Sequence, residues 1–140
     1  MKIAFTGTQQ GMSANQLDEL RALLRGHKPK IAIHGDCIGG DAQFHDVVRE
    51  ECPDALVWIF PSNIDAKSAH KIGDLIELQS PPLRRNHSMV DECDLLVAGP
   101  KTLEEVLRSG TWATIRYARK THKKVTMLRP EVSPIEQLLG

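Results

Sequence analysis

Three short glycine-containing segments have residue types and spacing that suit the binding of an anion. Glycine lets the backbone turn without a Cβ clash, so bare N–H groups can approach a phosphate. For each segment the alternative is a tight turn with no ligand. The predicted ligand contacts in these segments are Gly7, Thr8, Gln9, Gly35, Asp36, Gly39, Gly40, Ser109, Gly110 and Thr111.

Ser109-Gly-Thr111 is the best phosphate candidate among the three segments. It stands where we expect a helix to begin, so free N–H groups and the positive end of the helix dipole would face an anion. The alternative is simple N-capping by Ser109 or Thr111. In the segment that follows His34, Asp36 suits contact with a sugar hydroxyl, whereas Asp41 is better interpreted as the N-cap of a helix than as a catalytic acid.

Spacing excludes two common nucleotide motifs. Gly7-x-x-x-Gly11 does not fit the G-x-G-x-x-G dinucleotide fingerprint, and the second predicted strand ends at His34 rather than at a ribose-binding carboxylate. Residues 35–40 lack the Lys-Ser/Thr pair of a P-loop, so ATP hydrolysis is not expected. The histidines show no H-x-x-x-H spacing and the three cysteines form no C-x-x-C pair, so we predict no metal site and no disulfide framework.

Arg84 and Arg85 fall in the first turn of a predicted helix, where positive charge opposes the helix dipole. This placement indicates pairing with an anionic ligand, and Arg84, Arg85 and the adjacent Asn86 are predicted ligand contacts. The alternative is a solvated pair of surface arginines.

Short apolar runs alternate with helical segments along the chain. We predict strands over residues 2–5, 31–33, 55–60, 94–99 and 124–128, and main helices over 14–26, 41–52, 81–93 and 112–122. This order predicts a Rossmann-like α/β fold in three layers, with a mainly parallel sheet of about five strands flanked by helices. Loops that follow parallel strands meet at one carboxyl edge, where the three glycine segments converge.

The remaining segments give weaker signals. Ser13 and Gln16 match a capping box at the start of the first helix. Residues 61–80 are polar without clean periodicity and are expected to form a long loop or lid, with room for a helical turn, and residues 104–107 are predicted to form a helical turn. With no repeat and no linker, one domain spanning residues 1–140 is expected.

Composition limits the function classes. Lys plus Arg equals Asp plus Glu, 18 of each, which argues against a generally basic nucleic-acid-binding protein. Apolar residues make up 41% of the chain, as in ordinary globular proteins. No stretch approaches the roughly 20 apolar residues that span a bilayer, and the first residues do not resemble a secretory signal. We therefore expect a cytoplasmic protein with no membrane partner.

Several segments together resemble the SLOG superfamily, which includes DprA, molybdenum-cofactor carrier proteins and the LOG phosphoribohydrolases. The matching pieces are the Thr-Gly-Thr start at residues 6–8, the stretch 34–41, Arg-Asn-His-Ser-Met at 85–89, and the stretches 94–99 and 108–118. They cover most of the chain from residue 3 to about 128 and are most similar to the small, YpsA-related single-domain branch. The resemblance implies a Rossmann-like nucleotide-binding fold and a homodimer.

The resemblance also implies possible catalytic roles. Arg85 matches the arginine of the R-x-x-x-M segment that contributes to the LOG catalytic site. Thr102-Leu-Glu-Glu105 is similar to the T-x-E-E part of the LOG signature, which makes Glu104 and Glu105 candidate catalytic residues. The chain departs from that signature because no glycines precede Thr102, and Ala113 and Thr114 follow the other candidate loop where carboxylates would be expected.

These observations predict a sensor or carrier that binds a nucleotide or nucleotide derivative through its phosphate. The alternatives are a nucleoside 5′-monophosphate phosphoribohydrolase, in which a glutamate would stabilise positive charge at the sugar, and a DprA-like single-stranded DNA-binding protein. The low aromatic content of 4% and the balanced charge count against DNA binding. We expect a bound nucleotide or phosphate and no required cofactor.

Overall fold

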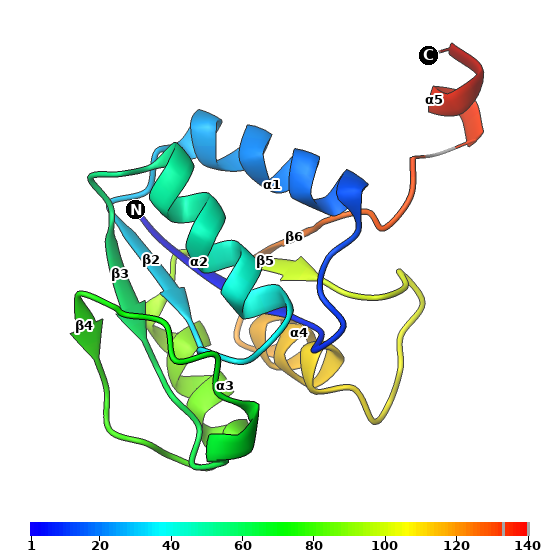
Figure 1. Cartoon of the computed structure of the whole chain (residues 1–140). Coiled ribbons are helices and arrows are strands. Elements are labelled where there is room, and N and C mark those ends of the chain that lie inside the picture. The colour runs from blue at the N-terminus through cyan, green and yellow to red at the C-terminus, as the bar shows by residue number, and fades with distance from the viewer. Residues whose placement is uncertain (133, 140) are drawn as a thin grey trace.

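The computed structural model describes residues 1–132 and 134–139, so residues 133 and 140 of the predicted domain lie outside the described residues. Helices cover both faces of a parallel sheet (Figure 1). The elements are β1 (Lys2–Gly7), α1 (Ala14–His27), β2 (Ile31–His34), α2 (Gly40–Glu51), β3 (Leu56–Ile59), the 3-10 helix η1 (Asp65–Lys67), β4 (Leu75–Ile76), α3 (Pro82–Glu92), β5 (Leu95–Gly99), α4 (Gly110–Lys120), β6 (Lys124–Met127) and α5 (Pro134–Leu139).

The sheet has six strands in the order β4-β3-β2-β1-β5-β6, and every neighbouring pair is parallel. The predicted Rossmann-like α/β fold is confirmed, but the predicted count of about five strands is one too low. The strand order reverses at β1, whose neighbours are β2 on one side and β5 on the other. In such sheets, ligands bind outside the carboxyl ends of the strands at the point of reversal.

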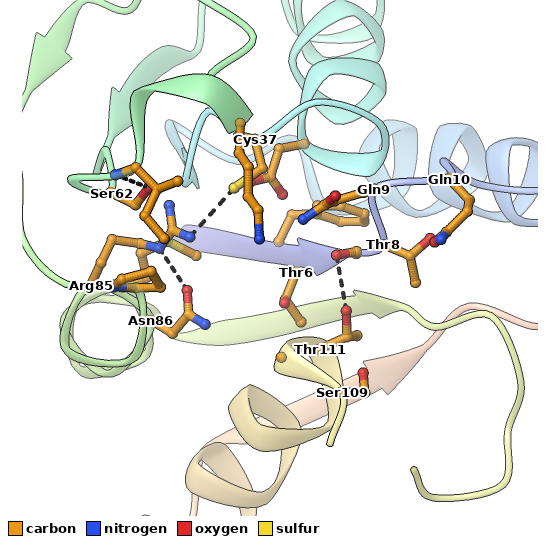
Figure 2. A pocket seen from close by; sticks show the side chains of 18 of the residues that line it. Thr6, Thr8, Gln9, Gln10, Cys37, Ser62, Arg85, Asn86, Ser109 and Thr111 are labelled. Carbon is orange, nitrogen blue, oxygen red and sulfur yellow. Dashed lines mark hydrogen bonds between the residues drawn. The ribbon is translucent and has the colours of Figure 1, made fainter. Parts of the chain in front are cut away.

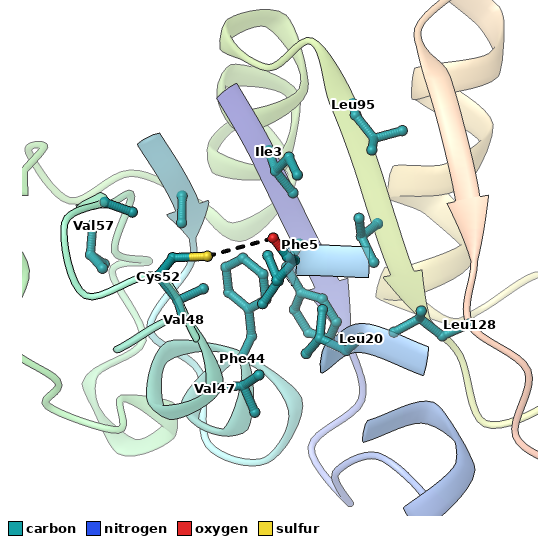
Figure 3. Packing of buried hydrophobic residues seen from close by; sticks show 14 of the residues in the cluster. Ile3, Phe5, Leu20, Phe44, Val47, Val48, Cys52, Val57, Leu95 and Leu128 are labelled. Atoms are coloured by element: carbon teal, nitrogen blue, oxygen red, sulfur yellow. Dashed lines mark hydrogen bonds between the residues drawn. The ribbon is translucent and has the colours of Figure 1, made fainter. Parts of the chain in front are cut away.

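The two faces of the sheet have separate cores because successive strand residues point to opposite sides. Ile3 and Phe5 of β1 belong to the cluster under α1 and α2, where the rings of Phe5 and Phe44 stack with centroids 4.9 Å apart (Figure 3). Ala4 belongs to the cluster under α3 and α4, with Met89 and Leu96. Because both faces are covered, β5 and the middle of β1 are buried, as their apolar sequences predict.

The start of α1 is confirmed as a capping box. The Ser13 side chain accepts the backbone N–H of Gln16, and the Gln16 side chain accepts the N–H of Ser13. Gln16 also donates to the carbonyls of Pro100 and Leu128. This cap therefore ties the first helix to the ends of β5 and β6 as well as starting it.

Three local predictions are corrected. Residues 61–80 contain the helical turn η1 that the segment had room for, but also the edge strand β4, which the sequence conceals because both β4 residues, Leu75 and Ile76, are exposed. Residues 104–107 form no helical turn; the reverse turn there is closed by the N–H of Ser109 donating to the Val106 carbonyl. Asp41 is not the N-cap of α2, because Gly39 takes that position. In the part of the chain described, no helix combines the length and apolar character needed to cross a bilayer.

Candidate functional site

A cavity of about 530 Å³ opens at the carboxyl edge of the sheet, beside β1 where the strand order reverses (Figure 2). Its walls come from the loop after β1, the loops after β2 and β3, the first turns of α3, and the start of α4. The lining residues are Phe5, Thr6, Gly7, Thr8, Gln9, Gln10, Cys37, Asp41, Ser62, Ile64, Lys67, Pro82, Arg85, Asn86, Met89, Arg108, Ser109, Gly110 and Thr111.

The start of α4 forms one wall and is fixed to β1. The Thr111 hydroxyl donates to the Gly7 carbonyl at 2.9 Å (Figure 2). The Ser109 side chain accepts the N–H of Trp112, so Ser109 caps α4. The N–H groups of Gly110 and Thr111 belong to the first turn, whose donors have no partner within the helix. A Cβ added at Gly110 would meet nothing within 4 Å, so the space above this residue is open.

The glycines of the loop before α2 bring two loops together. Gly39 has a φ of 85°, and a Cβ there would collide with the Gln9 carbonyl. The N–H of Gly40 donates to the Thr8 carbonyl at 2.8 Å. Gly39 and Gly40 thus pack backbone against backbone on the loop after β1, and neither lines the cavity.

Arg85 is buried and joins three segments at the floor of the cavity. Its Nη1 donates to the carbonyls of Gly35 at 2.6 Å and Phe60 at 3.1 Å, and its Nε donates to Asn86 Oδ1 at 2.7 Å. Nη2 lies 3.4 Å from the Cys37 sulfur. A Cβ at position 35 would collide with the guanidinium, so Gly35 makes room for Arg85. Arg85 is a predicted ligand contact, but most of its N–H donors form hydrogen bonds within the protein.

Asp41 places a carboxylate in the cavity lining, as Arg85 does a guanidinium. Its Oδ2 accepts the N–H groups of Gly35 at 3.2 Å and Cys37 at 3.1 Å, which explains why it does not cap α2. Burial raises the pKa of Asp41 to about 6, while the charge of Arg85 and the two N–H donors act in the opposite direction. Burial also raises the pKa of the Cys37 thiol.

The cavity brings together eight of the predicted ligand contacts. They are Gly7, Thr8, Gln9, Arg85, Asn86, Ser109, Gly110 and Thr111. The predicted contacts that do not line it are Gly35, Asp36, Gly39, Gly40 and Arg84. Asp36 instead bonds to residues 68–71, and Arg84 is exposed.

The two candidate catalytic glutamates also lie outside the cavity lining. Both are exposed, and Glu105 pairs with Arg116 at 3.5 Å. Glu105 lines a separate shallow hollow with Leu103, Trp112 and Arg119. Among the described residues, no cluster of His, Cys, Asp or Glu is arranged to hold a metal ion.

Sequence reasoning missed several lining residues. Arg108 directly precedes the phosphate candidate, so its position in the chain was a usable signal. Lys67 and Ser62 belong to the segment without periodicity, which offers no such signal. Cys37 and Asp41 come to the cavity because the loop after β2 folds back around the Asp41 carboxylate.

No family model matches the chain, and no curated protein matches it by sequence. Solved structures do match. The molybdenum cofactor binding protein from Rippkaea orientalis is 17% identical, with a TM-score of 0.69, and the match covers 99% of this chain and 80% of that one. The Moco carrier protein from Chlamydomonas reinhardtii is 21% identical, with a TM-score of 0.66 and the same coverage. DprA from Streptococcus pneumoniae is 14% identical, with a TM-score of 0.63, covering 90% of this chain and 49% of that one.

At these identities the likeness shows the fold alone: this chain shares its α/β fold with the molybdenum cofactor binding protein, the Moco carrier protein and DprA. The comparisons contradict the expectation that no cofactor is required, because two of the matching structures are a molybdenum cofactor binding protein and a Moco carrier protein.

Proposed function

We propose that this protein is a sensor or carrier that binds a nucleotide or a related phosphorylated ligand in the cavity beside β1. One observation carries the proposal: the first turn of α4, with Gly110 and Thr111, opens onto a cavity that Arg108 also lines. Free N–H donors, the positive end of a helix dipole and a guanidinium are a combination that suits a phosphate.

The size and composition of the cavity agree with this proposal. Its volume of about 530 Å³ lies within the range of roughly 300–1,000 Å³ that is typical of small-molecule sites. Ile64 and Pro82 supply apolar surface for a ring system, while Thr8, Gln9 and Asn86 supply polar groups that could orient it. The matching molybdenum cofactor binding and carrier proteins support a binding role, since their names describe holding a cofactor.

Binding is a better proposal than hydrolysis. A phosphoribohydrolase needs a carboxylate beside the sugar, and neither Glu104 nor Glu105 lines the cavity. The carboxylate that does line it, Asp41, already accepts two backbone N–H groups and lies near Arg85. The catalytic roles of Arg85, Glu104 and Glu105 remain predictions from the family resemblance.

Calorimetry on the wild-type protein tests the proposal, with a panel of nucleoside monophosphates, cyclic nucleotides, ADP-ribose and the molybdenum cofactor. We expect at least one member to bind. A folded sample that binds none of them would overturn the proposal.

A pair of glycine variants locates the binding. Gly110→Ala puts a methyl group where the free protein has open space, so it should leave stability within about 1 kcal/mol of wild type. The methyl would stand between the phosphate and the helix N–H groups, so affinity should fall by about tenfold or more. Gly26→Ala is the matched control, because Gly26 also has open space and lies in α1, away from the cavity. Equal affinities for the two variants would contradict the assignment.

A further inference from the structure

We infer that Asp36 is a positioning residue that holds Lys67 at the cavity as a second anion contact, across β1 from Arg108 and the start of α4. The site therefore favours ligands with anionic groups at two ends over ligands with one. This inference rests on the proposed function.

Asp36 fastens the segment that carries Lys67. Its Oδ2 accepts the Ser68 hydroxyl at 2.9 Å, its Oδ1 accepts the Lys71 N–H at 2.9 Å, and its carbonyl accepts the Ala69 N–H at 2.8 Å. Next to it, the N–H of Ile38 donates to the carbonyl of Lys67 at 2.9 Å. Four hydrogen bonds thus tie residues 67–71 to the loop after β2.

Asp36 is itself held in place. It is buried, and its N–H donates to His34 Nδ1 at 2.9 Å. The other ring nitrogen of His34 lies 2.9 Å from His45 Nδ1, and both histidines are buried at the end of β2 and on α2. The backbone of Asp36 is therefore held by the buried His34, and the Asp36 carboxylate in turn holds residues 67–71.

The charges of the cavity divide between its two sides. Lys67 follows β3 and lies against the loop after β2, whereas Arg108 follows β5, and β1 runs between β2 and β5. Both side chains line the cavity, and among the described residues neither takes part in an ion pair. The third cation, Arg85, is already bonded within the protein. Two cations on opposite sides therefore suit two separate anionic groups.

The test compares adenosine 5′-monophosphate with adenosine 3′,5′-bisphosphate by calorimetry at fixed ionic strength. Wild type should bind the bisphosphate about tenfold more tightly, as expected for one more charge-assisted contact. Lys67→Met should bring the ratio of affinities close to one. Asp36→Gly should do the same and add little to Lys67→Met in the double variant, because both changes remove one contact. Lys101→Met is the control, because Lys101 is an exposed loop lysine that does not line the cavity.

Asp36→Gly is chosen because the φ of 57° at this position suits glycine, so the carboxylate is removed without backbone strain. Hydrogen exchange of the ligand-free variant should show lost protection at the amides of Ala69 and Lys71 and unchanged protection in α4. Asp36→Asn retains an acceptor oxygen and should give an intermediate ratio.

The outcomes separate the inference from the proposed function. If wild type binds neither adenosine phosphate nor any other panel member, the proposed function fails. If wild type binds both adenosine phosphates but Lys67→Met or Asp36→Gly keeps the tenfold preference, the inference is overturned. Unchanged hydrogen exchange at Ala69 and Lys71 in Asp36→Gly would overturn it as well.

Discussion

At the scale of single residues, Arg85 shows how far a functional prediction can differ from a structural position. Its place in the first turn of a helix indicated a ligand contact, and it does line the cavity. Its guanidinium nevertheless binds the carbonyls of Gly35 and Phe60, which lie 50 and 25 residues away in the chain. Partners so far apart in the chain cannot be predicted from a local pattern. The capping pair Ser13 and Gln16 could be predicted, because the two residues are three apart.

We predict that Arg85→Met is strongly destabilising. It removes the guanidinium donors of two buried carbonyls and the cation near the buried carboxylate of Asp41, so the free energy of unfolding should fall by about 3–5 kcal/mol. Arg84→Met is the control, because Arg84 is exposed and should change stability by no more than about 0.5 kcal/mol. Urea unfolding at pH 7 measures both, and equal values would contradict the structural role of Arg85.

At the scale of elements, the sequence predicted the strongly periodic parts and missed the parts that depend on neighbours. The four main helices and the five longer strands were located to within a few residues, because each buries an apolar face. β4 was missed because this two-residue edge strand has exposed side chains and is defined by its pairing with Trp58 and Ile59 of β3. Lys67 was missed for the same reason, since contacts with the loop after β2 fix its segment.

The junction of β2 and α2 gives a prediction about pH. His34 Nδ1 accepts the N–H of Asp36, so the neutral ring carries its proton on Nε2, facing His45. Burial, followed by the charge of His45, lowers the pKa of His34 to about 3. In the unfolded chain this ring binds a proton below its ordinary pKa of about 6.5, whereas in the folded protein it stays neutral down to about 3. Acidification through this window therefore favours the unfolded state.

The measurement compares the unfolding free energy of wild type with that of His34→Asn, whose amide oxygen can still accept the N–H of Asp36. Between pH 7 and pH 5, wild type should lose about 2 kcal/mol relative to the variant. Asp41 has the opposite effect, because its raised pKa of about 6 stabilises the folded protein as the pH falls. This effect is present in both proteins, so it cancels when the unfolding free energy of the variant is subtracted from that of wild type. A difference that stays constant with pH would show that His34 titrates normally.

At the scale of the whole molecule, the fold and the general position of the site follow from the order of strands and helices. Parallel strands gather their following loops at one edge, so the glycine segments at 7–11 and 109–111 meet beside β1. Which of these loops lines the cavity and which packs against its neighbours does not follow from the order of strands and helices. The loop at 35–40 contributes packing and the anchor Asp36, because Gly39 and Gly40 lie against the backbone of the loop after β1 and Gly35 lies against the Arg85 guanidinium.

The central claim is that an anion is held at the start of α4, and amide chemical shifts in a titration with adenosine 5′-monophosphate test it most directly. The account predicts saturable shifts that are largest at Gly110 and Thr111, with smaller ones at Gly7 and Thr8 in the adjoining loop. Unchanged amides at 110 and 111, with the saturable shifts elsewhere, such as the hollow lined by Arg25, Lys28 and Lys30, would contradict it.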